Sequence, residues 1–307
     1  MWETMIETGK LTKRFDKFTA VRDLSLLVEQ GELLALLGPN GAGKTTTVRM
    51  LGAILKPTEG WARVAGYDVV QNAKEVRHAV GLLTEFHGLY LRMKALEYLN
   101  FFGELHGMVQ HERRERSEML LRRFELWDDR ERRLGEYSKG MRQKLALIRS
   151  MIHDPEVLFL DEPTSAMDPH SAKLVRDCIA ALKQDGHTIV MCSHNLSEAE
   201  LLADRIAIMR RGEIIAYGTP ADLKSQLLGK SILEIRLAES LDGFLPLIES
   251  QVEIESVGTD WVRYFAAEPR VTNPALLASL TGAGVRVVTL SEVPRSLEEV
   301  YLKIVAD

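Results

Sequence analysis

The chain is 307 residues long, enough for two domains, and its 46% hydrophobic and 27% charged residues are ordinary for a globular protein. Its formal net charge of −5 excludes a nucleic-acid-binding protein with a dominant basic surface. The longest stretch without a charged residue, 271–285, is too short for a bilayer span, which takes about 20 apolar residues. The N-terminal segment also lacks the apolar core of a signal peptide, so we expect a cytosolic protein.

Short strands are predicted within residues 4–37, and the last of them is the continuous apolar run 33–37, which indicates a buried strand. Phe15 is an aromatic residue in this region that could stack on a purine. A strand aromatic packed in the core has the same spacing, so the sequence pattern leaves both interpretations open.

A glycine-rich segment follows the strand 33–37 and precedes a helix indicated by Val48, Leu51 and Leu55. It fits the phosphate-binding loop pattern of Gly, four residues, Gly-Lys and then Ser or Thr. In such a loop, backbone N–H groups and a helix N-terminus converge on one anion, and glycines permit close approach. A glycine turn with a chance lysine is the alternative. The lysine of the loop can reach the β- and γ-phosphates, and the first threonine can bind Mg²⁺. The candidate binding residues are Gly38, Asn40, Gly41, Gly43, Lys44, Thr45 and Thr46.

Residues 91–153 show no strand pattern and are predicted to form a helical insertion in the nucleotide-binding fold. The loop 85–90 before it mixes a carboxylate, aromatic residues and glycine, as functional surface loops often do. The insertion ends in a helix from 139 to about 152. Ser138 suits its N-cap, and Gly140 in the first turn exposes backbone N–H groups. By itself this segment is only a capped helix.

Two adjacent carboxylates, Asp161 and Glu162, follow the apolar strand 157–160. Burying adjacent acids without a cation is costly, so the pair indicates function rather than packing. In a phosphate-loop protein the first acid typically holds Mg²⁺, and the second is placed to take a proton from water. Surface acids on a loop are the alternative.

A further strand, 188–192, ends at Ser193 and His194. We favour function for His194, because the carboxyl ends of strands are where open α/β sheets bind ligands. The segment 197–200 matches a capping box and predicts the start of a helix there. Short strands at 206–209 and 213–217 then predict a hairpin.

Residues 1–220 form the first predicted domain, 221–230 a linker helix and 231–307 a C-terminal α+β domain. The linker begins with a proline at the first helical position. The element order strand, helix, strand, strand, helix, strand resembles a small ferredoxin-like domain and carries no chemical motif. The expected strands are 231–237, 251–257, 261–266 and 285–290, and the expected helices are 242–250 and 274–282.

Residues 4–220 resemble the nucleotide-binding subunit of an ABC transporter, because independent motifs occur in that family's order and spacing. They are Walker A at 38–46, the signature motif at 137–143, Walker B with its catalytic glutamate at 157–162, the D-loop at 165–168, and the switch histidine His194. Phe15 falls at the adenine-stacking position, Glu85 at the Q-loop and Asp168 at the end of the D-loop. The resemblance implies an α/β P-loop NTPase cassette with a RecA-like core, an antiparallel β subdomain and a helical subdomain, binding ATP and Mg²⁺.

By the same resemblance, two copies, or this chain and a related ATPase, would dimerise head to tail. Each ATP would lie between one Walker A and the partner's Ser138 and Gly140, a contact favoured only while the γ-phosphate charge is present. Lys44 and Thr45 would hold phosphate and Mg²⁺. The catalytic side would comprise Asp161 on Mg²⁺, Glu162 polarising water, and His194 sensing the γ-phosphate.

Two departures from the family pattern stand out. Glu85 replaces the usual glutamine of the Q-loop, where its oxygen could still meet Mg²⁺, and the signature reads Tyr-Ser-Lys-Gly-Met instead of Leu-Ser-Gly-Gly-Gln. With the C-terminal domain, these variations resemble the branch of drug-resistance, sodium and polysaccharide exporter ATPases.

The predicted function is ATP hydrolysis that powers export through a separately encoded transmembrane permease. The chain would meet the inner face of the cell membrane only through that permease, with the loop 85–90 against its cytoplasmic helices. A non-transport ABC ATPase acting on nucleic acid or ribosomes is the alternative, but this chain lacks the long coiled coil or tandem cassettes of those relatives. A regulatory module that binds ATP without hydrolysis is a third hypothesis, opposed by intact Asp161, Glu162 and His194.

Overall fold

The computed structural model describes residues 4–84, 88–165, 167–228, 231–241, 243–266, 268–293, 296–298 and 301. The chain divides into two compact units, residues 1–220 and 221–307. Within the described ranges, no helix combines the length and the hydropathy that a membrane crossing requires.

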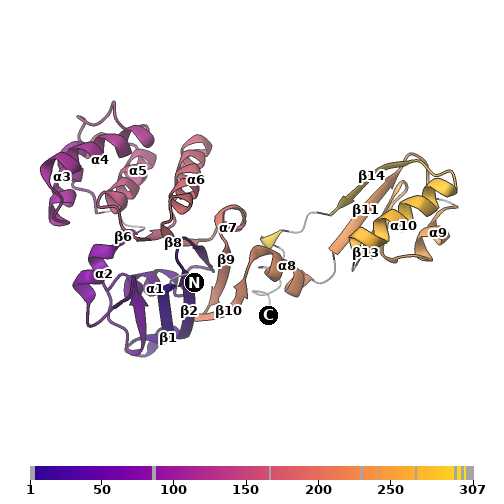
Figure 1. The fold of residues 1–307 in the computed structure, drawn as a ribbon, viewed down its shortest axis with the longest axis horizontal. Helices are drawn as coiled ribbons and strands as arrows, with labels where there is room; N and C mark the ends of the chain where they lie inside the picture. The colour runs from indigo at the N-terminus through magenta and orange to yellow at the C-terminus, as the bar shows by residue number, and fades with distance from the viewer. Residues whose placement is uncertain are drawn as a thin grey trace. The chain divides into compact units, whose positions relative to one another are not determined.

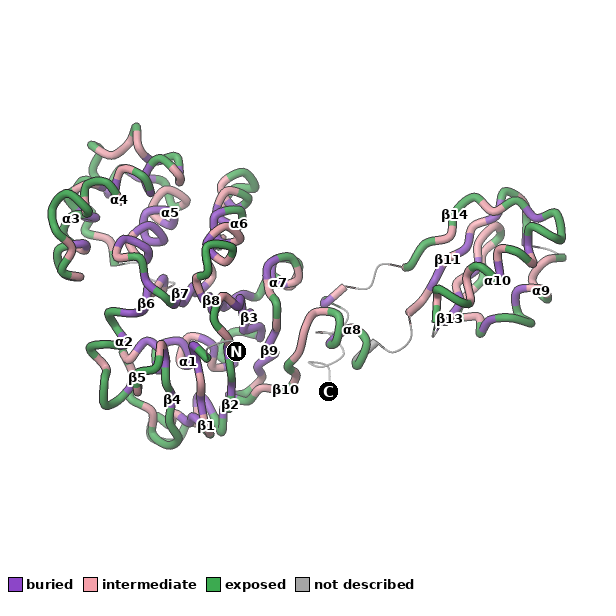
Figure 2. The backbone as a smooth tube through the Cα atoms, viewed as in Figure 1, coloured by how far each residue is buried: buried purple, intermediate pink, exposed green. Residues whose placement is uncertain are grey.

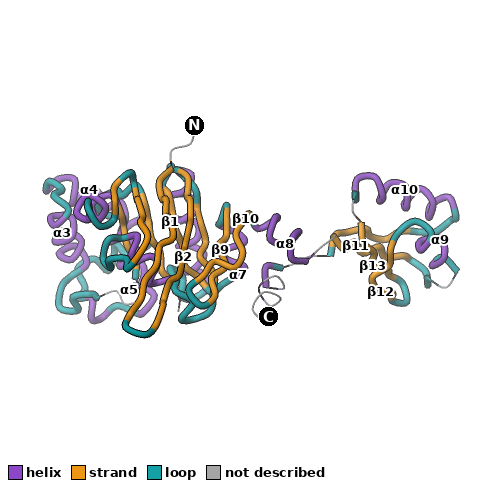
Figure 3. Tube along the Cα trace, turned by 90° about the horizontal axis from the view of Figure 1, so that it is seen from below, coloured by secondary structure: helices purple, strands orange, loops and turns teal. Residues whose placement is uncertain are grey.

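An antiparallel sheet opens the first unit, and its long hairpin is plain in Figure 3. In spatial order its strands are β2 (Phe18–Glu29), β1 (Thr4–Phe15), β4 (Glu59–Val64) and β5 (Tyr67–Asp68). Buried and exposed residues alternate along most of β2, because one face of the sheet packs on the core and the other meets water. The hairpin turn brings Phe15 and Phe18 opposite each other.

A six-stranded sheet forms the centre of the same unit. In spatial order its strands are β10 (Glu213–Gly218), β9 (Arg205–Arg210), β3 (Leu33–Leu37), β8 (Thr188–Ser193), β7 (Val157–Asp161) and β6 (Val80–Leu83). All neighbours pair in parallel except β10, which runs antiparallel to β9 at one edge. Every residue of β3, β7 and β8 is buried, as expected for parallel strands that are covered on both faces (Figure 2).

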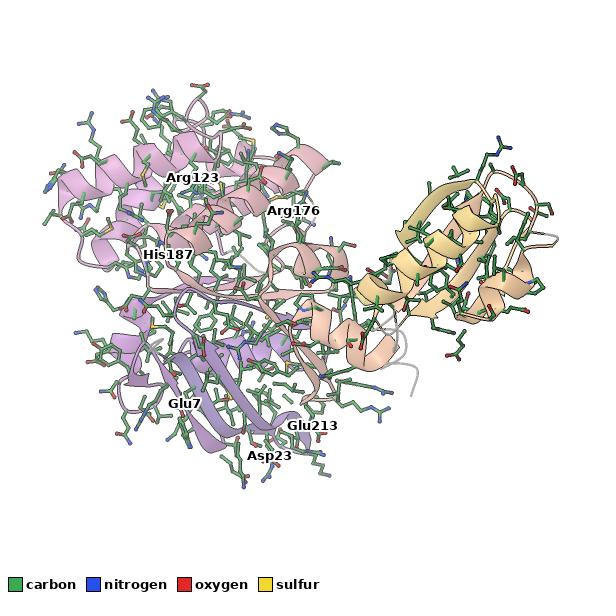
Figure 4. All side chains as sticks on the ribbon, turned by 45° about the vertical axis from the view of Figure 1, so that its right-hand side comes forward. Glu7, Asp23, Arg123, Arg176, His187 and Glu213 are labelled. Atoms are coloured by element: carbon green, nitrogen blue, oxygen red, sulfur yellow. The ribbon has the colours of Figure 1, made fainter. Side chains whose placement is uncertain are left out.

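The helices of the first unit are α1 (Lys44–Leu51), α2 (Ala73–Ala79), α3 (Ala95–Leu105), α4 (Gln110–Arg123), α5 (Lys139–Met151), α6 (Pro169–Gln184) and α7 (Leu196–Leu202), with a 3-10 turn η1 (Leu134–Glu136). Helices α3, α4 and α5 gather in one group (Figure 1) and lie between β6 and β7 in the chain, where the sequence predicts a helical insertion. Figure 4 labels Arg123 on α4 and Arg176 on α6.

Apolar side chains from both sheets and from α1 form a common core. Val48 and Leu51 of α1 lie in one buried cluster with Leu24 of β2 and Leu36 of β3. Helix α1 also packs against β2 and β4. The glycine-rich loop is therefore held between a buried strand and a helix that is fixed on both sheets.

The second unit has its own core and its own antiparallel sheet. Its elements are α8 (Pro220–Leu228), β11 (Ser231–Leu237), α9 (Leu245–Glu249), β12 (Glu253–Val257), β13 (Trp261–Ala266), α10 (Pro269–Gly282) and β14 (Val287–Glu292), with the strands in the order β12-β13-β11-β14. Ile235 and Tyr264 of the sheet share a buried cluster with Leu276 and Leu280 of α10.

Helix α10 begins earlier than the predicted start at 274. Pro269 lies in the first turn of the helix, where backbone N–H groups have no partner within the helix, so the N–H that proline lacks is not needed there. Pro274 lies inside the helix. The predicted start at the second proline is therefore wrong.

Candidate active site

The carboxyl ends of β3, β8 and β7 meet at one edge of the six-stranded sheet. Leu37 pairs with Ser193, and Asp161 pairs with Cys192, so the segments that follow these strands emerge side by side. A cavity of about 570 Å³ opens there. Its described lining consists of Phe18, Ala20, Asn40, Gly41, Ala42, Gly43, Lys44, Thr45, Thr46, Asp161, Glu162, Ser165 and His194.

The loop between β3 and α1 can be built only with glycine at two positions. A Cβ on Gly38, where φ is +156°, would lie 2.3 Å from the carbonyl oxygen of Met209. A Cβ on Gly43, where φ is +108°, would lie 2.5 Å from the carbonyl oxygen of Ala20. Both approaches are far inside van der Waals contact, so these glycines set the path of the loop.

Lys44 is a buried cation at the first position of α1, with 7% of its surface exposed. Its Nζ donates hydrogen bonds to the carbonyl oxygens of Gly38 at 2.6 Å and Pro39 at 3.2 Å. Across the residues that the structure describes, no carboxylate forms an ion pair with it. A buried ammonium without a counter-ion is costly, and a helix N-terminus attracts anions. The residues present therefore fit a phosphate group.

Thr45 and Asp161 supply two oxygen atoms at the same place. The Thr45 Oγ1 donates a hydrogen bond of 2.8 Å to Oδ2 of Asp161, whose residue is 3% exposed. Mg²⁺ prefers oxygen ligands and is commonly held by one or two protein groups together with substrate phosphates. This hydroxyl and carboxylate fit that ion beside a bound triphosphate.

Glu162 and His194 form the second pair of the site. The Nδ1 atom of His194 lies 2.8 Å from Oε1 of Glu162, and both residues line the cavity. The Glu162 backbone has φ of +51°, in the left-handed region that glutamate rarely adopts. A carboxylate and an imidazole in contact can together accept and donate protons.

The aromatic residue on the cavity wall is Phe18 rather than Phe15. Phe18 is 61% exposed, while its cross-strand neighbour Phe15 does not belong to the described lining and carries the Lys13 ammonium over its ring at 5.1 Å. Phe15 is 44% exposed, so core packing does not account for it, and its contact with adenine stays a prediction. The sequence pattern alone does not single out Phe18, although a hairpin turn at this point would place it opposite Phe15.

The other predicted site residues lie elsewhere. Ser138 is exposed and caps α5 with its side chain, and Gly140 is partly exposed in the first turn of that helix. Asp168 caps α6, and hydrogen bonds from Ser171 lower the pKa of its carboxyl group. Glu85 lies outside the described residues.

Comparison with known proteins places this architecture. The family described as ABC transporter matches residues 21–165, and the family described as ATP-binding protein DrrA1-3-like, C-terminal domain, matches residues 218–305. The chain is 36% identical over 311 residues to the daunorubicin resistance ATP-binding protein DrrA3 of Streptomyces coeruleorubidus, covering 100% of this chain and 98% of that protein. This chain belongs to the ATP-binding proteins of ABC transporters.

Two further likenesses cover the cassette of this ABC protein. The chain is 44% identical over 219 residues to the ABC transporter ATP-binding protein NatA of Bacillus subtilis (strain 168), covering 70% of this chain and 89% of the relative. A solved structure described as an ATP binding subunit of an ABC transporter has a TM-score of 0.68 and 28% identity, covering 73% of this chain and 93% of that chain. The predicted P-loop cassette and ABC ATPase are confirmed, and these relatives give the nucleic-acid alternative no support.

Proposed function

We propose that this ABC protein binds and hydrolyses ATP to drive export through a separately encoded membrane permease. The buried Lys44 ammonium, paired with backbone carbonyls at the N-terminus of α1, is the observation that carries the proposal. The match of residues 218–305 to a DrrA-like domain, and the resistance named for a full-length relative, support the direction of transport.

In this proposal, Lys44 and the loop amides hold the β- and γ-phosphates. Thr45 and Asp161 would hold Mg²⁺, which neutralises phosphate charge when bound. Phe18, and Phe15 as predicted from the sequence, are the aromatic groups available to the adenine ring.

Glu162 and His194 act together in the proposed hydrolysis step. Glu162 orients a water molecule and accepts its proton, while the water oxygen bonds to the γ-phosphorus and the bond to the leaving ADP oxygen breaks. His194 contacts both the carboxylate and the developing phosphate charge. The carboxylate thereby also fixes the orientation of the imidazole ring.

Dimerisation completes the site. Ser138 and Gly140 do not line the described cavity of their own chain. They lie at the start of α5, where Ser138 is exposed and Gly140 partly exposed, and a helix N-terminus attracts negative charge. A second copy, or a related ATPase, would bring this N-terminus to the γ-phosphate, and Asp168 would lie at the dimer contact. The dimer would close while the γ-phosphate is present and reopen after its loss.

The membrane contact is proposed beside the loop 85–90. Tyr90, Leu91 and Phe101 are each at least 40% exposed although they are apolar, which favours a docking surface for a protein partner. The chain would then lie at the inner face of the cell membrane through its permease. We also propose 1–220 as the ATPase domain, 221–230 as a linker and 231–307 as an accessory domain that supports dimerisation.

A paired assay of phosphate release and size exclusion tests the mechanism. Glu162→Gln should lower kcat by about 100-fold or more while ATP binding persists and ATP holds the variant as a dimer. Glu156→Gln, an exposed glutamate before the same strand, should behave as wild type. A Glu162→Gln chain that stays monomeric with ATP, or that turns over normally, would contradict the mechanism.

Co-expression with the product of a neighbouring gene that has about six apolar spans tests the partner. The expected result is co-purification and an ATPase rate that depends on the permease. Recovery of DNA or ribosomes instead of a membrane protein would contradict the proposed export function.

A further inference from the structure

The side-chain amide of Gln143 is buried and bonds to the backbone of Glu162, the proposed catalytic glutamate. Gln143, in the second turn of α5, is 5% exposed. Its Nε2 donates hydrogen bonds to the carbonyl oxygens of Glu162 at 3.1 Å and Pro163 at 3.2 Å. Both N–H bonds of one amide are thus used on two successive peptide groups. Such a fork fixes the orientation of those peptides as well as their position.

The turn that carries Glu162 needs this support. With φ of +51°, the Glu162 backbone lies in a region that L-residues adopt only when their surroundings hold them there. On one side, the Glu162 N–H donates to the Cys192 carbonyl at 2.9 Å, which ties the residue to β8. On the other side, its carbonyl accepts from the local Ser165 N–H at 3.2 Å and from Gln143. Gln143 therefore joins this turn to α5.

The backbone conformation determines where the carboxylate lies. With the peptide groups held in this way, Oε1 of Glu162 reaches Nδ1 of His194 at 2.8 Å and the side chain faces the cavity. A rotation of the Glu162 backbone toward ordinary dihedral angles would move the carboxylate away from that position. Gln143 can therefore influence catalysis without touching the nucleotide.

The same helix begins at the proposed dimer contact. Gly140 lies three residues before Gln143, one helical turn away, and Ser138 caps the helix. A helical turn is stiff on this scale, since its backbone hydrogen bonds connect residues four apart. A displacement of the α5 N-terminus is therefore passed to the amide that holds Glu162.

We propose that Gln143 is a positioning residue for ATP hydrolysis. It holds Glu162 in its left-handed conformation and ties that conformation to the helix whose N-terminus meets the partner's nucleotide. This inference rests on the proposed function, in which Glu162 activates water and the start of α5 closes on the second ATP. Closure of the dimer and competence for hydrolysis are linked through this amide.

Steady-state kinetics with Gln143→Met tests the inference, because methionine has a similar length and no donor. We expect kcat to fall by about 10- to 100-fold with KM for ATP within about two-fold of wild type. ATP should still hold the double variant Gln143→Met, Glu162→Gln as a dimer. Gln184→Met, at the exposed end of α6, is the matched control and should keep wild-type kinetics.

Gln143→Glu supplies a readout that a purely structural role would not produce. An ionised carboxylate cannot donate to the two carbonyls, whereas the protonated acid can donate to one of them. The ratio of kcat for Gln143→Glu to kcat for Gln143→Met should therefore rise as the pH is lowered from about 8 to about 6, because burial favours the neutral acid. A constant ratio would contradict the role of the donor.

The outcomes separate this inference from the proposed function. If the wild-type chain hydrolyses ATP and Gln143→Met has the same kcat per ATP-binding site, this inference is overturned and the proposed function still stands. A wild-type chain that neither hydrolyses ATP nor dimerises with it would overturn the proposed function, and this inference with it.

Discussion

The Nδ1 atom of His194 lies 2.8 Å from Oε1 of Glu162, although 32 residues separate the two in the chain. Neighbouring parallel strands bring them together, because β7 ends just before Glu162 and β8 ends just before His194. The contact is thus set by the register of two buried strands. Mutating His194 and Glu162 one at a time can therefore separate their roles.

Replacing His194 removes the group that contacts the Glu162 carboxylate and that we propose to contact the γ-phosphate. His194→Ala should lower kcat by about 100-fold while ATP binding changes little, since the phosphate loop is intact. Phosphate release at saturating ATP and equilibrium binding of a fluorescent ATP analogue measure the two quantities. His111→Ala, an exposed histidine on α4, is the control. Equal losses in binding and in turnover would contradict a role confined to catalysis.

The hydrogen bond between Thr45 and Asp161 predicts how the site depends on Mg²⁺. Thr45→Val keeps the shape of the side chain and removes the oxygen, so half-maximal ATPase should need about ten-fold more Mg²⁺. Thr45→Ser keeps the hydroxyl and should titrate like wild type. A magnesium titration at fixed ATP compares the variants, and coincident curves for Val and Ser would refute the assignment.

Gly140 offers a test of the proposed dimer contact that spares the fold. A Cβ at this position meets nothing within 4 Å, and alanine is the better helix former by about 1 kcal/mol, so thermal stability should be equal or higher. In the Glu162→Gln background, Gly140→Ala should weaken the ATP-dependent dimer by about ten-fold or more, because the methyl group occupies a close backbone contact. Gly282→Ala, also without neighbours within 4 Å, is the control for analytical ultracentrifugation. Undiminished dimerisation would argue against this surface.

Glu198 is a buried carboxylate that links the turn after Glu162 to two helices. Its side chain accepts from the Thr164 hydroxyl at 2.8 Å and lies 3.4 Å from Nη1 of Arg176, the residue labelled on α6 in Figure 4. Glu198→Ala should lower the free energy of unfolding by about 2 kcal/mol, because it leaves both partners unsatisfied.

Urea denaturation of wild type and Glu198→Ala measures this loss in the free energy of unfolding. Glu118→Ala removes an exposed pair with Arg122 and should cost less than about 0.5 kcal/mol. If the two losses were similar, the buried network would have no special weight.

His153 predicts a loss of stability in acid. Burial, together with the neighbouring His106 ring stacked at 3.6 Å, lowers the pKa of His153 to about 4. In the unfolded chain this histidine has its ordinary pKa of about 6.5 and binds a proton at a pH where the folded chain does not. The free energy of unfolding therefore falls as the pH drops from 6.5 toward 4. The loss from this group reaches at most about 3 kcal/mol.

The variant His153→Gln tests this titration while keeping a donor for the Val80 carbonyl, which lies 3.1 Å from Nε2. Its free energy of unfolding should change less between pH 6.5 and 4, measured by denaturation at each pH. A pH dependence identical to wild type would show that His153 does not titrate as inferred.

Local patterns predicted most of the cassette because they follow from short-range geometry. The loop after β3, the acids after β7 and His194 after β8 are each set by an apolar run and the residues directly behind it. Their convergence follows from parallel pairing, which brings carboxyl ends to one edge.

Contacts between distant elements could not be predicted. The expected capping box at 197–200 is wrong: α7 begins at Leu196 and Asn195 caps it by accepting from the Glu198 N–H, so Ser197 and Glu200 lie inside the helix. The buried side chain of Glu198, which accepts from Thr164 and pairs with Arg176, also depends on segments that lie far from it in the sequence. The bond from Gln143 to Glu162 likewise joins α5 to the turn after β7, and no local sequence pattern contains that contact.

The position of β3 has a consequence for synthesis on the ribosome. Both neighbours of Leu33–Leu37 in the sheet, β8 and β9, are translated more than 150 residues after it. A nascent chain that has just completed Asp161 therefore carries this apolar strand with both edges open, a state prone to aggregation. The ATP loop can acquire its final support only when the second half of the cassette has left the exit tunnel, so nascent chains of this length are natural clients for chaperones.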